Sequence, residues 1–282
     1  MNRILSAQTN ASGKGLNVAV SLAQLGVNTA LTGFLYAENK HLHEAVLQRY
    51  GVTNRCLLCE GAARLNIKAL DRSTGAVTEI NDSGVQATPQ QCDDVLRRIV
   101  DLAQESAYMV LTGSLPPGCP KDFYARVIEA VKTPVFLDAE GESLKTALEA
   151  GPFLIKPNRY ELELLSGVPL PTLEDVSLAA KNCIRKGAKH VVVSLGAQGA
   201  LYTDGSEVLF APALSVDAVS TVGAGDGMLS GLLYGLTTSG TMEAALRCGT
   251  AAGAASVLTP GTDPLEKANF DAFLEQVQIA RQ

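Results

Sequence analysis

The sequence carries no excess of positive charge and no long hydrophobic run. Its formal net charge is −6, which argues against nucleic acid or an anionic membrane as the main partner, because both attract basic surfaces. No apolar run approaches the ~18 residues of a membrane span, and no signal-peptide pattern follows Met1. We therefore expect a cytoplasmic protein that binds neither nucleic acid nor a membrane.

Cysteine and histidine show no regular spacing either. The six cysteines are scattered through 282 residues, so they do not form a disulfide framework and are expected to be reduced thiols. Cys56 and Cys59 make one CxxC without a second pair, and His41 and His43 have no third ligand nearby in the sequence. This pattern disfavours a metal or redox site. The chain does have 46% hydrophobic residues, enough to bury the core of a large folded domain.

Short apolar runs alternate with amphipathic stretches in the middle of the chain. Four of these runs, each followed by a helical pattern, are AYMVL (107–111), PVFLD (134–138), PFLIK (152–156) and HVVVSL (190–195). The alternation predicts βαβ units, and therefore an α/β fold with a mostly parallel sheet flanked by helices. Ligands bind at the carboxyl ends of the strands in such sheets. The segments that follow the runs there are GSLPPG (113–118), KPNRYE (156–161) and SLGAQG (194–199).

Residues 63–82 break this alternation. Arg64, Asn66 and Lys68 fall on one face of a strictly alternating stretch, apolar side chains fall on the other, and a turn follows at DRSTG. The pattern predicts a β-hairpin, and two cations on its polar face suit a lid over a negatively charged ligand. A solvated face is the alternative for these cations. It fits Lys68 better than Arg64, because a guanidinium group pairs with phosphate in a bidentate way.

A glycine-led helix start is predicted in SVDAVSTVGAGDG (215–227). Asp226 directly follows Gly223, Ala224 and Gly225, and an apolar pattern at near-helical spacing comes next. The first turn of a helix exposes backbone N–H groups and the positive end of the helix dipole, which together make an anion site. A carboxylate beside an anion site suggests phosphoryl transfer. The alternative is a tightly packed helix start in which glycine only permits close approach.

A second glycine-led helix start is predicted in residues 10–26, NASGKGLNVAVSLAQLG, where Gly13 and Gly15 bracket Lys14. This segment is not a Walker A loop, because no glycine precedes GK at the required distance and Gly15 stands where Ser or Thr is needed. The GAGDGM segment also lacks the third glycine of a dinucleotide fingerprint, which would fall at Met228. Both common nucleotide-binding motifs are therefore excluded.

These features together resemble the phosphofructokinase B group of the ribokinase family of sugar kinases, over a stretch from Met1 to about Thr262. Ser220 to Asp226 read STVGAGD, which matches the family's second signature, and GSLPPG, KPN-x-x-E, SLG-x-x-G and a late GT follow the family's order. The SGKGLN loop, the RLNIK strand and TEIN are most similar to the 1-phosphofructokinases, with tagatose-6-phosphate kinases close behind. The resemblance implies one ribokinase-like domain over residues 1–282, with a β lid contributed by about 1–12 and 60–84.

The resemblance also implies the chemistry, with ATP and Mg²⁺ as cofactors. D-fructose 1-phosphate would be phosphorylated to the 1,6-bisphosphate, and tagatose 6-phosphate is the alternative substrate. Asp226 would orient the acceptor hydroxyl and accept its proton. The N–H groups of Gly223, Ala224 and Gly225 would stabilise the transferred phosphoryl group. The alternative from another class is a catalytically silent sugar-phosphate-binding protein on the same fold.

The remaining site residues are assigned by the same resemblance. The sugar phosphate would be held by Gly13, Lys14, Asn17, Arg64, Asn66, Lys68 and Ser114. The nucleotide would be held by Lys156, Ser194, Gly196, Gly199, Gly223 and Gly225, with the small residues Ala251 to Ala255 beside the adenine. Asn158 and Glu161 match an N-x-x-E motif that holds Mg²⁺ largely through water. The same two residues also form a sequence pattern for a helix capping box, and both roles can hold together.

Three features of the family pattern differ in this chain. Ser12 stands where the first signature has Ala or Gly, and Tyr36 stands where it has glycine. Relatives begin with a strand of the type TLNPALD, which carries an aspartate that hydrogen-bonds sugar hydroxyls, before the part that matches residues 2–15. We therefore expect this chain to be a truncated form that lacks the strand. Family members dimerise through their lids, which also makes a homodimer an expectation.

Overall fold

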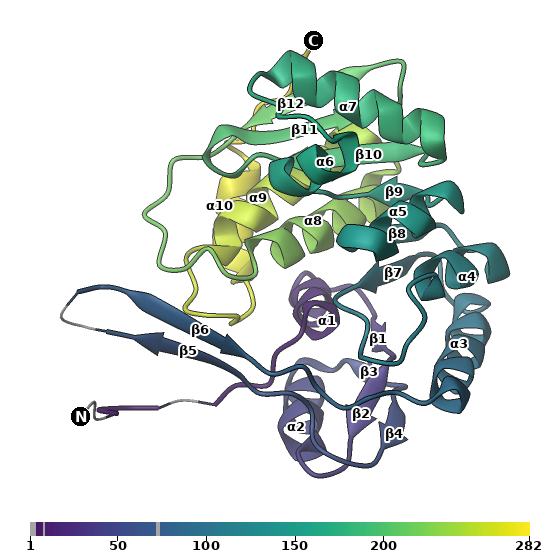
Figure 1. The fold of residues 1–282 in the computed structure, drawn as a ribbon. Helices are drawn as coiled ribbons and strands as arrows, with labels where there is room; N and C mark the ends of the chain where they lie inside the picture. The colour runs from purple at the N-terminus through teal and green to yellow at the C-terminus, as the bar shows by residue number, and fades with distance from the viewer. Residues whose placement is uncertain (1–3, 8, 72–73) are drawn as a thin grey trace.

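The computed structural model describes residues 4–7, 9–71 and 74–282, and its main feature is a seven-stranded sheet in the order β13-β12-β11-β10-β9-β8-β7 (Figure 1). The parallel strands are β7 (Met109–Thr112), β8 (Val135–Asp138), β9 (Leu154–Ile155) and β10 (His190–Ser194). The antiparallel strands are β11 (Gly199–Thr203), β12 (Val208–Pro212) and β13 (Ala280–Arg281). The four parallel strands lie in the four predicted apolar runs.

Helices cover both faces of this sheet. One face is covered by α3 (Pro89–Ala103), α4 (Phe123–Ala130), α5 (Gly141–Glu149), α6 (Arg159–Ser166) and α7 (Leu173–Lys186). The other face is covered by α1 (Lys14–Gln24), α8 (Ala224–Ser239), α9 (Met242–Ser256) and α10 (Lys267–Leu274). No helix in the described ranges is long and apolar enough to cross a bilayer. The predicted α/β fold with a mostly parallel sheet is therefore confirmed.

Neighbouring residues of the central strands supply the two halves of the core. Phe136 and Leu154 pack with α1, α8 and α9, whereas Leu137 and Ile155 pack on the opposite face with α5, α6 and α7, and all four are 0% exposed. Side chains alternate between the faces of a strand, so a strand with both faces covered is apolar at every position. This is why the sequence shows continuous apolar runs.

One sequence expectation about the sheet is wrong. A helical pattern was expected after residues 190–195, but β10 is followed by the short 3₁₀ turn η1 (Gly196–Gln198) and then by the antiparallel strand β11. Gly199 opens this strand with φ of 115°, and a Cβ built there would lie 2.0 Å from the carbonyl oxygen of Ala211. Only glycine permits such close approach of two strands.

Helices α8 and α9 pack backbone to backbone. Gly227, Gly231 and Gly235 recur every four residues on α8, and a Cβ on Gly231 would lie 2.3 Å from the carbonyl oxygen of Cys248 on α9. The small residues on α9 fill this contact, since Ala251, Ala252 and Ala255 are 0% exposed. The pattern of small residues therefore serves helix packing, and the placement of residues 251–255 beside an adenine stays a prediction.

The predicted hairpin is present as β5 (Asn66–Leu70) and β6 (Val77–Asn81) and projects from the body of the molecule (Figure 1). Part of its predicted turn, residues 72–73, lies outside the described ranges. A smaller region beside it contains α2 (Lys40–Tyr50) and the parallel pairs β1 (Ala30–Leu31) with β3 (Thr53–Asn54) and β2 (Phe34–Tyr36) with β4 (Leu57–Cys59).

The amino-terminal part of the chain bears on two expectations, the contribution of residues 1–12 to the lid and the effect of Tyr36. Residues 1–3 and 8 are not described, and the described part of residues 1–12 forms no strand, so its contribution to the lid stays a prediction. Tyr36, which replaces a family glycine, ends β2, and no non-glycine residue in the described ranges has a positive φ. The position of Tyr36 therefore does not require the conformational freedom of glycine.

Candidate active site

Two lysines share one buried carboxylate at the carboxyl edge of the parallel strands. Asp138 ends β8, Lys156 follows β9, and Lys14 opens α1. The Oδ2 atom of Asp138 lies 3.6 Å from Nζ of Lys156 and 3.7 Å from Nζ of Lys14. Asp138 is 3% and Lys156 is 4% exposed, whereas the side chain of Lys14 is 40% exposed. Lys14 and Lys156 were predicted site residues. Sequence reasoning missed Asp138, although its place at the end of the run PVFLD was a signal.

Asp226 lies in the first turn of α8, as predicted, and is 6% exposed. Nδ2 of Asn17 on α1 donates a 2.8 Å hydrogen bond to its Oδ2 atom. Burial raises the pKa of Asp226, and the negative charge of Asp138 adds to this effect. The Asn17 bond and the positive charges of the two lysines act in the opposite direction. The net result is a carboxylate that accepts a proton more readily than an ordinary aspartate does.

Lys156 lies near the glycine turn that precedes Asp226, and Lys14 interacts electrostatically with Asp226 itself. Burial works against the charge on Lys14, but Asp138, Asp226 and other acidic groups outweigh it and raise the pKa of Lys14. A Cβ built on Gly225 would lie 3.4 Å from Nζ of Lys156, so this ammonium group contacts the start of α8. The ammonium groups of Lys14 and Lys156 and the amino terminus of α8 therefore surround the carboxylate of Asp226. This arrangement is suited to binding and transferring an anionic group.

Asn158 and Glu161 form the capping box of α6. Oδ1 of Asn158 accepts a 2.9 Å bond from the Glu161 N–H, and Oε2 of Glu161 accepts a 2.8 Å bond from the Asn158 N–H. Burial raises the pKa of Glu161, while the capping bond and the two lysines of the cluster lower it. Glu161 therefore belongs electrostatically to the same site. No group of three His, Cys, Asp or Glu side chains in the described ranges is placed to ligate one metal ion.

The other predicted residues on the nucleotide side lie around β10. Ser194 ends this strand and forms an isolated parallel bridge with Asn158, Gly196 is exposed in η1, and Gly199 is buried. The close approach of Gly199 to Ala211 already explains why glycine is needed at this position, so its role toward a nucleotide stays a prediction.

All six cysteines are free thiols in the structure.

The residues predicted to bind the sugar phosphate do not all lie beside the Asp226 cluster. Gly13 precedes α1 and Ser114 follows β7, and both are exposed. Arg64, Asn66 and Lys68 are exposed on the hairpin, where Lys68 forms a 2.9 Å ion pair with Glu79. Among the residues that the structure describes, no hydrogen bond or ion pair joins these three to the Asp226 cluster. Their part in binding stays a prediction.

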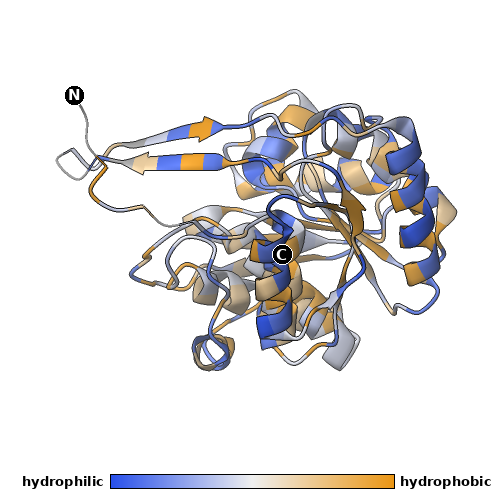
Figure 2. Cartoon of the chain, turned by 90° about the horizontal axis from the view of Figure 1, so that it is seen from below, coloured by the Kyte–Doolittle hydropathy of each residue, from blue (hydrophilic) through white to orange (hydrophobic). Residues whose placement is uncertain are grey.

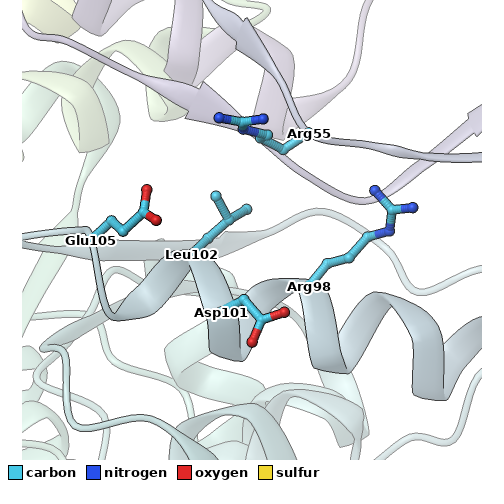
Figure 3. A pocket seen from close by; sticks show the side chains of 5 residues that line it. All are labelled: Arg55, Arg98, Asp101, Leu102 and Glu105. Atoms are coloured by element: carbon cyan, nitrogen blue, oxygen red, sulfur yellow. The ribbon is translucent and has the colours of Figure 1, made fainter.

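A surface pocket of about 270 Å³ lies apart from this cluster (Figure 3). Its lining consists of one residue between β3 and β4, three residues of α3 and one residue just after α3: Arg55, Arg98, Asp101, Leu102 and Glu105. The charged side chains among them are exposed and of both signs. None of the predicted site residues lines this pocket, so the candidate active site is defined by its buried charged groups.

Comparison with known proteins agrees with this geometry. The sequence profile described as pfkB family carbohydrate kinase matches residues 2–268. The chain belongs to this family. It is 34% identical to the 1-phosphofructokinase of Escherichia coli K12 over 99% of the chain and 90% of that enzyme. It is 36% identical to the 1-phosphofructokinase of Rhodobacter capsulatus over 95% of the chain and 86% of that enzyme.

Comparison with solved structures also relates this chain to the sugar kinases. Phosphofructokinase-2 from Escherichia coli, in complex with potassium, superposes with a TM-score of 0.87 at 29% identity, over 94% of this chain and 87% of that one. The predicted resemblance is therefore confirmed, and so is the reaction class. The protein is a phosphotransferase that acts on an alcohol group of a sugar phosphate.

Proposed function

We propose that this pfkB kinase transfers the γ-phosphoryl group of ATP to D-fructose 1-phosphate and forms the 1,6-bisphosphate. The observation that supports this most directly is Asp226, buried at the start of α8, held by Asn17 and flanked by the ammonium groups of Lys14 and Lys156. Two relatives that share about a third of their residues with the chain are named 1-phosphofructokinase.

In this proposal Asp226 orients the primary hydroxyl of the sugar and accepts its proton. A raised pKa makes the carboxylate a stronger base, which favours this transfer near neutral pH. The N–H groups of Gly223, Ala224 and Gly225 stabilise the charge on the transferred phosphoryl oxygens. Lys14 lies on the sugar side of that group and Lys156 on the nucleotide side.

Mg²⁺ fits the donor set, although the described part of the chain contains no cage of protein ligands. Mg²⁺ sheds its water reluctantly and is commonly held by one or two carboxylates together with substrate phosphates. The capping bond uses Oε2 of Glu161, which leaves the other carboxylate oxygen for a water-mediated contact. The ion would neutralise phosphate charge when bound with ATP. Glu161 would hold it on the side of the nucleotide.

The choice of sugar is the part that needs a direct test. A ketofuranose phosphate is nearly symmetric end to end, so one anchored phosphate and one reacting CH₂OH also suit tagatose 6-phosphate. ADP release should be measured in parallel with fructose 1-phosphate, tagatose 6-phosphate and fructose 6-phosphate. The highest kcat/KM is expected for fructose 1-phosphate. A higher value for tagatose 6-phosphate would replace the proposed substrate, and no sugar-dependent ADP would favour a silent binding protein.

We also propose that two copies of the chain associate through their hairpins. Ile67 and Ile80 are paired across the strands and are 46% and 59% exposed, and Leu65 next to them is 57% exposed. Hydropathy colouring shows orange bands on both strands of the hairpin (Figure 2). A two-stranded hairpin with an uncovered apolar face is marginal in water. Sedimentation should give a dimer for the wild type and a monomer for Ile67→Lys.

A cytoplasmic location stays our prediction.

A further inference from the structure

Asp138 is a buried acidic residue to which the proposed reaction gives no role. A single oxygen atom of it, Oδ2, lies within ion-pair distance of the ammonium groups of both Lys14 and Lys156. The separation of the two nitrogen atoms therefore cannot exceed the sum of the two distances, 3.7 Å and 3.6 Å. One carboxylate thus limits how far apart the two cations of the site can lie.

The electrostatics of the cluster also depend on this residue. Asp226 and Glu161 act on the lysines from farther away, but in the described ranges every ion pair of Lys14 and Lys156 is with Asp138. Lys156 is 4% exposed, and a buried charge without a close partner is strongly unfavourable. Without Asp138 the two ammonium groups would repel each other and lose the contact that fixes their directions.

We propose that Asp138 is a positioning residue that holds Lys14 and Lys156 on the two sides of the transferred phosphoryl group. It acts through the lysines and does not touch the reacting atoms. Phosphoryl transfer depends mainly on positioning and on fixed positive charge, so the spacing of the two ammonium groups affects both substrates. This inference rests on the proposed assignment of Lys14 to the sugar phosphate and of Lys156 to the nucleotide.

The test compares Asp138→Asn, which keeps the shape but removes the charge, with Glu142→Gln. Glu142 lies in the exposed first turn of α5, and its substitution makes the same charge change away from the lysines. Asp138→Asn should raise KM for both ATP and the sugar phosphate and lower kcat/KM by about 10- to 100-fold, the scale seen when a residue that orients a functional group is lost. Glu142→Gln should change neither KM. A lower active fraction with both KM values unchanged would mean that Asp138 is only structural.

A double-mutant cycle with Lys156→Met adds a readout that a structural role would not give. If Asp138 acts partly through Lys156, adding Asp138→Asn should lower kcat/KM less in Lys156→Met than in the wild type, because only the ion pair with Lys14 is left to lose. Fully additive losses would overturn the proposal. If Asp138→Asn alone fails to fold, the double variant, which lacks the unpaired buried cation, is compared with Lys156→Met, and an unchanged KM for the sugar phosphate would then overturn the role through Lys14.

Binding of ATP separates this inference from the choice of sugar. Calorimetric titration with ATP alone should show weaker binding to Asp138→Asn than to the wild type, and unchanged binding to Glu142→Gln. That result would support the positioning role even if none of the tested sugars were phosphorylated. Unchanged ATP binding in Asp138→Asn would overturn the role even if fructose 1-phosphate were confirmed as the substrate.

Discussion

Asn17 on α1 donates a 2.8 Å hydrogen bond to the carboxylate of Asp226 on α8, across 209 positions of the sequence. One turn farther along α8, Oγ of Ser230 donates a 3.2 Å bond to the carbonyl oxygen of Val18. These two bonds join the starts of the two glycine-led helices. The two glycine-led helix starts predicted from the sequence therefore lie side by side, with Asp226 between them.

Replacement of Asp226 should separate activity from stability. We expect Asp226→Asn to lower kcat by ~10²-fold or more, the usual scale for loss of a general base. Its melting temperature at neutral pH should be equal or higher. Because burial raises the pKa of this carboxyl in the folded state, its charge lowers stability at neutral pH, and that stability returns as the pH falls through the folded-state pKa. A variant with near-normal kcat would remove Asp226 from the mechanism.

Loss of the Asn17 bond should change the pH dependence of the reaction. This bond lowers the pKa of Asp226, so Asn17→Ala should raise that pKa further. The base must be ionised to accept a proton, and the acid limb of the kcat profile should therefore move to higher pH. Ser230→Ala breaks the neighbouring bond between the helices without contacting the carboxylate, and it should leave the acid limb in place. An unshifted acid limb in Asn17→Ala would contradict the role of this bond.

Arg64 offers a test of phosphate recognition by the hairpin. A charge-assisted bond to phosphate contributes ~1.5–3 kcal/mol, so Arg64→Ala should weaken binding of fructose 1-phosphate by about 10- to 100-fold. Lys68→Ala is the matched control, because Lys68 is already paired with Glu79, and a smaller effect is expected. Affinities should be measured for fructose 1-phosphate and for fructose. Equal losses for the two sugars in Arg64→Ala would show that Arg64 does not anchor the phosphate.

Local signals in the sequence predicted the parts of the fold that depend on near neighbours. The four apolar runs became parallel strands, and Asn158 with Glu161 formed the predicted capping box. The missed features depend on segments far apart in the chain. Asp138 looks like the polar end of a buried strand until Lys14 is brought beside it from α1. The packing of the small residues of α9 on α8 is likewise not visible in the sequence.

The contact between α8 and α9 gives a prediction about stability. A Cβ on Gly231 would lie 2.3 Å from the carbonyl oxygen of Cys248 and 2.6 Å from Cβ of Ala252, and neither backbone nor a buried methyl group can move away easily. Gly231→Ala should therefore lower the free energy of unfolding by at least ~1–3 kcal/mol, the usual effect of overpacking.

Gly253 on α9 is the matched control, since a Cβ there would have no contact closer than 3.5 Å, to Met228. Gly253→Ala should be neutral or stabilising by up to ~1 kcal/mol, because alanine favours the helix more than glycine does. Urea unfolding of both variants measures the difference. Equal midpoints would show that the two helices can separate without cost, and that α8 does not need glycine to hold Asp226 in place.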